Sequence, residues 1–120
     1  MPNFINEIYL IYKMNKTFNE RIYDLLKKVP KGKVTTYKAL AEKLGTKAYR
    51  AVGQAMRCNP YAPEVPCHRV IASDGSIGGF SGSINPKSKE VKRKISMLRK
   101  ENVKVENNKI TDFEKRLYQF

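Results

Sequence analysis

Apolar side chains recur at helical spacing after residue 17, which predicts a first amphipathic helix. Thr17-Phe18-Asn19-Glu20 has the form of a capping box, with a hydroxyl at the N-cap and a carboxylate three residues later. The apolar positions that follow repeat every three or four residues until Pro30 and Gly32 end the pattern. They are Phe18, Ile22, Leu25, Leu26 and Val29. One face of this helix is therefore expected in the core.

Two shorter helices are predicted after a short basic turn over residues 31–36. Thr36 can cap a helix from Tyr37 to Leu44, which Gly45 ends. Thr46 can cap the next helix, from about Lys47 to Arg57. Its apolar positions follow the i, i+3, i+4, i+7, i+8 pattern and are Ala48, Ala51, Val52, Ala55 and Met56. Two short helices joined by a glycine-containing turn are typical of a helix-turn-helix.

The second half of the chain mixes short strands with one longer helix. Glu64-Val65 is interpreted as the end of a short strand, since Pro66 biases Val65 toward extended geometry. A second strand is predicted at Val70-Ile71-Ala72, and a helix within residues 87–100 from the spacing of apolar side chains. These are Val91, Ile95 and Leu98, and the outer face of this helix is strongly basic.

The tail is predicted to form a small hairpin and a final helix. Two short runs, Val103-Lys104-Val105 and Ile110-Thr111, flank Asn107-Asn108, whose residue type tolerates positive φ. Phe113, Leu117 and Phe120 then have spacings compatible with a helix that closes the core. The fold class expected from all elements is mainly α with a small β component, a winged-helix-like helix-turn-helix domain.

The length of 120 residues fits one domain with a single core. We expect residues 17–120 to form this domain and residues 1–16 to be a short N-terminal extension. Within the extension, the apolar stretch from Phe4 to Tyr12 carries Asn6 and Glu7 and is interpreted as a strand or helix that packs on the domain.

A large positive charge distinguishes the composition. Lys and Arg number 24 against 11 Asp and Glu, which gives a formal net charge of +13 and a pI near 9.9. Polyanions accumulate on such a surface, although many basic proteins bind no nucleic acid. No apolar run approaches the ~18 residues of a membrane span and no secretory signal is recognisable. With only two cysteines and no disulfide framework expected, we predict a cytoplasmic protein without membrane contact.

One of the two cysteines stands directly before the only histidine, in Pro66-Cys67-His68-Arg69-Val70. A free thiol has a pKa near ~8.5, so a neighbouring base or positive charge is what makes it nucleophilic. A turn or helix start at Cys67 would direct backbone N–H groups toward the sulfur, and Arg69 adds charge. The alternative is a buried thiol beside a structural histidine. A zinc site is not expected, because Cys58, Cys67 and His68 supply three ligands and lack paired C-x-x-C spacing.

A glycine-rich loop follows the cysteine. Residues 77–83 contain three glycines around Phe80 and Ser81, and glycine permits the backbone to wrap closely around a flat ligand. A flexible surface turn is the alternative, but it would leave Phe80 without an evident role.

Four motifs in order resemble one family. Arg50-Ala51-Val52-Gly53, Asn59-Pro60, the segment Pro66 to Val70 and Gly78-Gly79-Phe80-Ser81-Gly82 together resemble the active-site region of the O6-alkylguanine-DNA alkyltransferases, also called methylated-DNA–protein-cysteine methyltransferases. The resemblance runs from about Thr17 to about Glu101.

The resemblance implies a DNA repair enzyme, a suicide alkyltransferase. Each protein molecule accepts one alkyl group and is then inactive. Cys67 would take the alkyl group of an O6-alkylguanine in double-stranded DNA, with His68 acting through a water and Glu101 orienting His68. Tyr37 would donate a proton to the guanine, and Asn59 would hold the active-site turn. The thioether product has no carbonyl for water to attack, so the thiol is not regenerated. No cofactor and no metal are implied, and we expect a monomer.

The resemblance also assigns DNA-binding residues. The helix of the Arg50 motif would enter the minor groove, with Arg50 in the gap left by the rotated nucleotide. The remaining substrate and DNA contacts are assigned to Ala51, Gly53, Met56, Arg69, Phe80 and Ser81. The small residues of this helix would otherwise form a face for tight helix packing. Few long polar side chains are available to read base edges, so sequence reading is expected to be weak.

Two other functions fit parts of the pattern. Alkyltransferase-like proteins share the scaffold and bind lesions without repair. They resemble this chain but carry a tryptophan in place of the reactive cysteine. This sequence has Cys67 there and no Trp, which argues against that function. A helix-turn-helix regulator would explain the charge and the helices but neither the Cys67-His68 segment nor the glycine loop. Typical family members carry a further N-terminal domain, in whose place only about sixteen residues are expected here. Cys58 is predicted to be a buried small hydrophobic residue.

Overall fold

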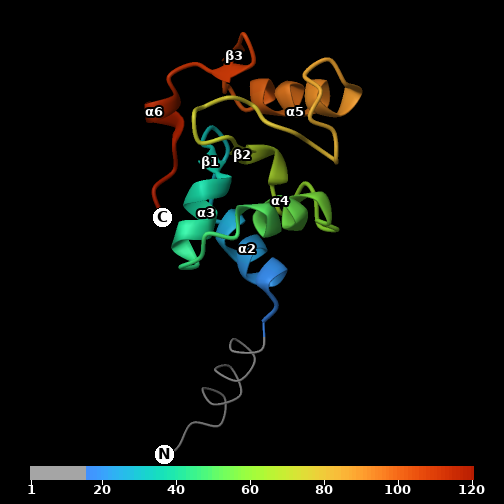
Figure 1. Cartoon of the computed structure of the whole chain (residues 1–120). Coiled ribbons are helices and arrows are strands. Elements are labelled where there is room, and N and C mark those ends of the chain that lie inside the picture. The colour runs from blue at the N-terminus through green and yellow to red at the C-terminus, as the bar shows by residue number, and fades with distance from the viewer. Residues whose placement is uncertain (1–15) are drawn as a thin grey trace, which may run out of the picture.

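The computed structural model describes residues 16–120 (Figure 1). The predicted N-terminal extension and the element predicted at Phe4 to Tyr12 lie outside the described residues, apart from Lys16. The helices are α2 (Phe18–Leu26), α3 (Tyr37–Lys43), α4 (Tyr49–Arg57), the one-turn 3₁₀ helix η1 (Cys67–Arg69), α5 (Lys89–Lys100) and α6 (Phe113–Arg116). The strands are β1 (Thr35–Thr36), β2 (Val70–Ile71), β3 (Val105–Glu106) and β4 (Lys109–Ile110). This mainly helical architecture with small sheets confirms the predicted fold class.

The capping box at the start of α2 forms as predicted. The Thr17 hydroxyl accepts a hydrogen bond from the Glu20 amide at 3.2 Å, and the Glu20 carboxylate accepts one from the Thr17 amide at 3.5 Å. Most of the inward positions of α2 are buried, namely Ile22, Tyr23, Leu25 and Leu26. The N-terminal helix therefore packs by the face that the apolar spacing indicated.

The two helices of the helix-turn-helix are present, but α4 begins later than predicted. Thr36 caps α3 by accepting a hydrogen bond from the Ala39 amide at 3.0 Å. Thr46 caps no helix. Its hydroxyl accepts from the Ala48 amide at 3.1 Å and stabilises the turn before α4 instead. The first helical residue is therefore Tyr49 rather than Lys47.

A parallel pair of strands joins the helix-turn-helix to the Cys67 segment. Strand β1 pairs with β2 in the register Thr35 to Val70 and Thr36 to Ile71. The sequence interpretation placed β1 in a basic turn, although Val34, Thr35 and Thr36 are β-branched. Because Thr36 also caps α3, this pairing holds the first residue of α3 close to the end of η1.

The strand predicted at Glu64-Val65 is wrong. Residues 60–65 form consecutive turns, in which the Val65 amide donates to the Tyr61 carbonyl at 3.0 Å. Three prolines in residues 60–66 restrict this connection and remove amide donors, which disfavours strand pairing there.

Two apolar clusters form the core, one on each side of the β1–β2 pair. The first cluster contains the buried faces of α2, α3 and α4 together with Val65, Cys67 and Val70. The second contains Val34, Ile71 and Ile77 with residues of α5 and the hairpin. Figure 1 shows α2, α3 and α4 below this strand pair and α5, β3 and α6 above it. The Cys67 segment therefore lies where the two clusters meet.

The predicted hairpin is confirmed, whereas the final helix is shorter than predicted. Asn107 and Asn108 have φ values of 50° and 63° in the turn between β3 and β4. Helix α6 ends at Arg116. The chain then runs beside Val34, whose amide donates to the Arg116 carbonyl at 2.8 Å and whose carbonyl accepts from Tyr118 at 2.8 Å. Pairing with this free edge replaces a helix that would have continued to Phe120.

Candidate active site

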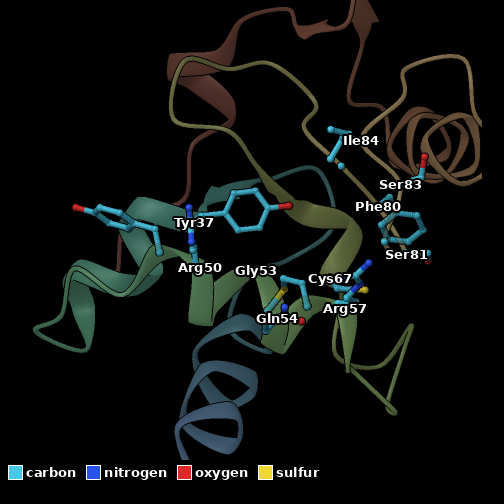
Figure 2. A pocket seen from close by; sticks show the side chains of 14 residues that line it. Tyr37, Arg50, Gly53, Gln54, Arg57, Cys67, Phe80, Ser81, Ser83 and Ile84 are labelled. Atoms are coloured by element: carbon cyan, nitrogen blue, oxygen red, sulfur yellow. The ribbon is translucent and has the colours of Figure 1, made fainter.

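A cavity of about 600 Å³ opens between α4, Tyr37 of α3 and the loop over residues 79–84. Cys67 lies at this cavity. Figure 2 shows Tyr37 and Phe80 on opposite sides of the cavity, with α4 along its lower side. Seven of the residues assigned by sequence line it, namely Tyr37, Arg50, Gly53, Met56, Cys67, Phe80 and Ser81.

Cys67 is the first residue of η1 and is 9% exposed. Its amide donates to the Val65 carbonyl at 2.9 Å, which fixes the turn that carries the sulfur. The same carbonyl accepts from the Asn59 side chain at 2.8 Å, and the other side-chain atom of Asn59 accepts from the Tyr61 amide at 2.9 Å. Asn59 therefore positions the turn before Cys67 and does not line the cavity.

His68, Glu101 and Arg69 form a buried cluster behind Cys67. His68 Nε2 is 3.1 Å from both carboxylate oxygens of Glu101. Arg69 binds the same carboxylate with two parallel hydrogen bonds, of 2.9 Å from Nε and 2.6 Å from Nη2. Its Nη1 donates to the Val29 carbonyl at 2.8 Å, which anchors the cluster to the turn after α2.

The charges of this cluster fix the tautomer of His68. Burial tends to raise the pKa of Glu101, but the hydrogen bonds from Arg69 and His68 outweigh it and hold that pKa below its usual value. Burial lowers the pKa of His68 and outweighs its bond to Glu101, so the imidazole is neutral near pH 7. A neutral imidazole next to a carboxylate donates from Nε2 and keeps its lone pair on Nδ1. His68 Nδ1 is buried and has no hydrogen-bond partner within residues 16–120. It is therefore available as a base.

Tyr37 faces the cavity as a protonated phenol. Burial, with a smaller effect of a charge on Cys67, raises the pKa of Tyr37 to about 12. The loop passes close to this ring, since a Cβ at Gly78 would be 3.9 Å from the Tyr37 hydroxyl. In Figure 2 the hydroxyl points into the cavity. Tyr37 can therefore donate a proton to a group bound there.

The loop opposite Tyr37 is a tight turn with a defined shape. Phe80 and Ser83 exchange two backbone hydrogen bonds, of 2.8 and 2.9 Å. Ser81 and Gly82 between them have φ values of 49° and 85°, as in a type I′ turn. A side chain at Gly79 would meet the Ser83 carbonyl at 2.7 Å, so only glycine fits there. Because Phe80 also packs on the first core cluster, the loop is a wall of the cavity and not a flexible surface turn.

The exposed face of α4 borders the same cavity. Arg50 lies in the first turn of α4 and is exposed. A Cβ at Gly53 would meet nothing within 4 Å, so this face is open in front of the glycine. The buried positions of α4 are Val52 and Ala55, whereas Gly53 lies on the cavity side. The small residue therefore does not serve tight helix packing. Ala51 is half-buried and does not line the cavity.

The structure bears on two sequence interpretations, of which the burial of Cys58 is wrong. Arg69 was assigned to DNA and to charge near the sulfur, but its guanidinium is bound to Glu101 and Val29 and does not line the cavity. Cys58 was expected to be buried and is exposed, because it is the C-cap of α4, where the chain leaves the core.

Sequence reasoning missed two cations of α5. Lys94 is fully buried, and the Arg93 guanidinium lies over the Phe80 ring at 5.4 Å. The signal for Lys94 was present, since it occupies the i+3 position between Val91 and Leu98 on the inward face. The charge of this helix was instead assigned to its outer face as a whole.

Metal and membrane features are absent from the described part of the chain. Within residues 16–120, no group of three His, Cys, Asp or Glu side chains is arranged to hold a metal ion. In the same residues, no helix has the length and apolar character needed to cross a membrane.

Comparison with known proteins gives a family match that covers most of the chain. Residues 17–103 match the family model described as 6-O-methylguanine DNA methyltransferase, DNA binding domain. A methylated-DNA–protein-cysteine methyltransferase of Candida glabrata is 38% identical over 92 residues, which are 76% of this chain and 44% of that protein. The protein of the same name from Metallosphaera sedula is 43% identical over 89 residues, 74% of this chain and 53% of that protein. The chain thus spans about half the length of these relatives.

Solved structures agree with the sequence matches. The O6-methylguanine-DNA methyltransferase of Pyrococcus kodakaraensis is 43% identical with a TM-score of 0.60, over 74% of this chain and 48% of that chain. S. pombe Atl1, crystallised with damaged DNA containing O6-carboxymethylguanine, is 30% identical with a TM-score of 0.71, over 86% of this chain and 95% of that chain. The Mycobacterium tuberculosis protein OGT in complex with DNA is 38% identical with a TM-score of 0.61, over 72% of this chain and 50% of that chain.

Proposed function

The chain belongs to the 6-O-methylguanine DNA methyltransferase family, and we propose that it moves the alkyl group of an O6-alkylguanine in duplex DNA onto its own Cys67. The observation that carries this proposal is the placement of the Cys67 thiol. It lies at a cavity that Tyr37 and Phe80 enclose, directly before a histidine whose free Nδ1 is held in the basic tautomer by Glu101.

The reaction is a displacement at the alkyl carbon. His68 Nδ1 takes the thiol proton through a water, and the resulting thiolate attacks the alkyl carbon. The carbon–sulfur bond forms as the bond between the carbon and O6 breaks. Tyr37 gives its proton to the departing guanine, which would otherwise leave as an anion. The imidazolium returns a proton to the Tyr37 oxygen by way of solvent, so the products are guanine and a neutral thioether on Cys67.

Duplex DNA is the proposed partner, and the lesion must leave the base stack to reach the sulfur. Extrusion of a base costs roughly a few kcal/mol in lost stacking and pairing. A planar guanidinium inserted in the gap offsets part of that cost. Arg50 is placed for this role, because it is exposed at the start of α4 and borders the cavity that would receive the base. The flat wall of Phe80 would then stack on the extruded guanine.

A second candidate function is lesion binding without transfer. The similarity to S. pombe Atl1, which was crystallised on O6-carboxymethylguanine DNA, favours it. The free thiol of Cys67 and the base beside it favour transfer, because a protein that only binds lesions needs neither.

The two candidates are separated by the fate of the lesion. The protein is incubated with a duplex that carries one O6-methylguanine, and the nucleosides are quantified after digestion of the DNA. Transfer predicts the loss of one O6-methylguanine per protein molecule and then no further loss. Cys67→Ser should bind the damaged duplex as the wild type does and remove no methyl group. A wild-type protein that binds the lesion and leaves it intact would establish the second candidate instead.

A further inference from the structure

Lys94 is a buried cation that the proposed reaction does not use. It lies on the inward face of α5 and is 0% exposed. Burial of a charged ammonium is unfavourable unless polar groups replace its water. Its ammonium donates to the carbonyls of Val70 at 2.7 Å, Ile77 at 2.6 Å and Gly79 at 3.1 Å. All three of its N–H donors are thus used.

These three carbonyls belong to the two segments that form the site. Val70 follows η1 directly, so its carbonyl is held one residue after the Cys67–Arg69 turn. Ile77 and Gly79 lead into the turn that carries Phe80. The ammonium therefore connects the segment of the nucleophile to the loop that forms the opposite wall of the cavity. No carboxylate in residues 16–120 pairs with Lys94, so backbone carbonyls alone hold it.

We propose that Lys94 is a positioning residue for alkyl transfer: by binding Val70, Ile77 and Gly79 together, it sets the position of the Phe80 wall relative to the Cys67 sulfur. This inference rests on the proposed function. A near-attack geometry tolerates little displacement, since a shift of about 1 Å in a reacting group costs roughly a hundredfold in rate.

Arg93, the neighbour of Lys94, contacts the tip of the same loop. Its guanidinium stacks on Phe80 at 5.4 Å and donates to the Ser81 hydroxyl at 3.1 Å. Helix α5 therefore holds the base of the loop from inside through Lys94 and its tip from outside through Arg93. The outer contact is exposed to solvent, so the buried contact is the stronger constraint.

The charge of Lys94 adds an effect on the nucleophile. Burial lowers the pKa of Lys94 to about 7, and a charge on Cys67 acts to raise it. The Lys94 ammonium and a negative charge on Cys67 therefore attract one another. The three carbonyl acceptors also favour the protonated lysine, since a neutral amine has only two N–H donors.

The test compares Lys94→Met, Lys94→Gln and the exposed control Lys92→Met on the same helix. The single-turnover rate of methyl transfer is measured at saturating damaged duplex, and affinity for undamaged duplex is measured separately. Lys94→Met should lower the rate by about ten- to a hundredfold, with affinity for undamaged DNA unchanged. Lys94→Gln keeps two donors without the charge and should recover part of the rate. Lys92→Met should match the wild type.

A second readout separates positioning from a general loss of fold. The rate of Cys67 alkylation by iodoacetamide is followed against pH, with the reactive thiol identified by peptide mapping. Loss of the Lys94 contacts should change the rate of Cys67 alkylation in both Lys94 variants, because Lys94 holds the segment that carries the sulfur. If Lys94→Met does not fold, Lys94→Gln decides. Folded Lys94 variants with wild-type rates of both methyl transfer and Cys67 alkylation would overturn this inference alone.

Failure of the proposed function gives a different result. In that case the wild type itself transfers no methyl group, whereas the iodoacetamide profiles still report whether Lys94 acts on Cys67. A changed rate of Cys67 alkylation in the Lys94 variants would then retain the effect of Lys94 on the thiol, and an unchanged rate would remove it.

Discussion

At the scale of single residues, the site depends on one carboxylate that serves two partners. Glu101 accepts hydrogen bonds from His68 and from Arg69 at the same time, and it is the C-cap of α5. Because Arg69 also binds the Val29 carbonyl, the cluster ties the histidine to both sides of the core. The orientation of His68 and the packing of α5 are therefore coupled.

Glu101→Gln should weaken both the chemistry and the fold. The amide presents one acceptor where the carboxylate presented two, so the paired bonds of Arg69 are broken and a buried guanidinium is left partly unpaired. Loss of a charged hydrogen bond of this kind costs about 2–3 kcal/mol of unfolding free energy. The transfer rate should fall by about 10²-fold or more, because His68 loses the partner that fixes its tautomer. Denaturant unfolding and single-turnover kinetics measure the two effects.

Glu106→Gln is the matched control, since Glu106 is exposed on the hairpin. It should change neither quantity. Equal transfer rates for the Glu101 variant and this control would contradict the assigned role of Glu101.

Stability should fall as the pH decreases below the ordinary pKa of histidine. The pKa of His68 is lowered in the folded protein by burial, so between that value and about 6.5 the unfolded chain binds more protons than the folded one. Unfolding free energy therefore rises with pH in this window and is lost on acidification, by at most about 1.4 kcal/mol per pH unit. Chemical denaturation of the wild type and of His68→Gln at pH 5 to 7 isolates the effect. A variant with the same pH slope as the wild type in that range would refute it.

Seven of the residues that sequence reasoning assigned to the site line the cavity, and they could be selected because chemistry-bearing residue types are few in the chain. The only histidine, the cysteine before it and the glycine loop are conspicuous in any reading. The partners of these residues were harder to assign. Arg69 and Lys94 carry charges that composition alone assigns to the surface, and only the fold shows that a carboxylate or three carbonyls surround them.

At the scale of elements, α4 combines a packed face with an open face. Val52 and Ala55 are fully buried, whereas Gly53 borders the cavity with nothing in front of its Cα hydrogens. Glycine lowers helix stability by about 1 kcal/mol relative to alanine. An open helix surface of this kind would allow the close approach of DNA that the proposed function requires.

Substitutions at Gly53 should separate stability from binding. Gly53→Ala should raise the unfolding free energy by about 0.5–1 kcal/mol, because the Cβ meets no neighbouring atom and the helix gains propensity. Gly53→Leu should fold as well but weaken duplex binding by at least about tenfold, or about 1.4 kcal/mol. Thermal unfolding and fluorescence anisotropy with labelled duplex measure these quantities. Undiminished binding by the leucine variant would remove α4 from the DNA interface.

The helices and the β3–β4 hairpin were predictable from local patterns, whereas strand β1 was not. Capping residues and apolar spacing mark α2 and α3 within the sequence itself. Strand β1 has two residues, and its partner lies 35 positions away at Val70, so no local pattern could indicate it. The end of α6 was also not predictable from a local pattern. The helix ends where Leu117 pairs with Val34, which is distant in the sequence.

At the scale of the whole molecule, the site lies at the junction of two core clusters. Val70 belongs to the first cluster and Ile71 to the second, so β2 crosses from one to the other directly after the Cys67 turn. Tyr37 comes from α3, which packs in the first cluster. Lys94 and Glu101 come from α5 and its C-cap, and α5 packs in the second cluster. The site therefore forms only when both clusters are folded.

The net charge of +13 should make DNA binding strongly dependent on salt. The slope of log K against log salt has a magnitude of about 0.9 for each DNA phosphate that the protein neutralises. Lys47→Ala, at the turn before α4, should reduce this magnitude by about 1. Lys104→Ala, which removes an equal charge near the hairpin, should leave it unchanged, because Figure 1 shows β3 above the β1–β2 pair and α4 below it. Binding titrations from roughly 50 to 300 mM salt measure both slopes. Equal slopes for the two variants would mean that the position of the charge on the protein does not matter for DNA binding.

The most direct test of the central claim is the site of alkylation within the protein. The protein is incubated with a duplex carrying one O6-methylguanine, its intact mass is measured, and the peptides are mapped. The exposed thiol of Cys58 serves as an internal control, since no histidine follows it in the sequence. We predict a gain of one methyl group, on Cys67 and not on Cys58. An unchanged mass with the damaged duplex bound, or a methyl group on Cys58, would contradict the assignment of Cys67 as the nucleophile.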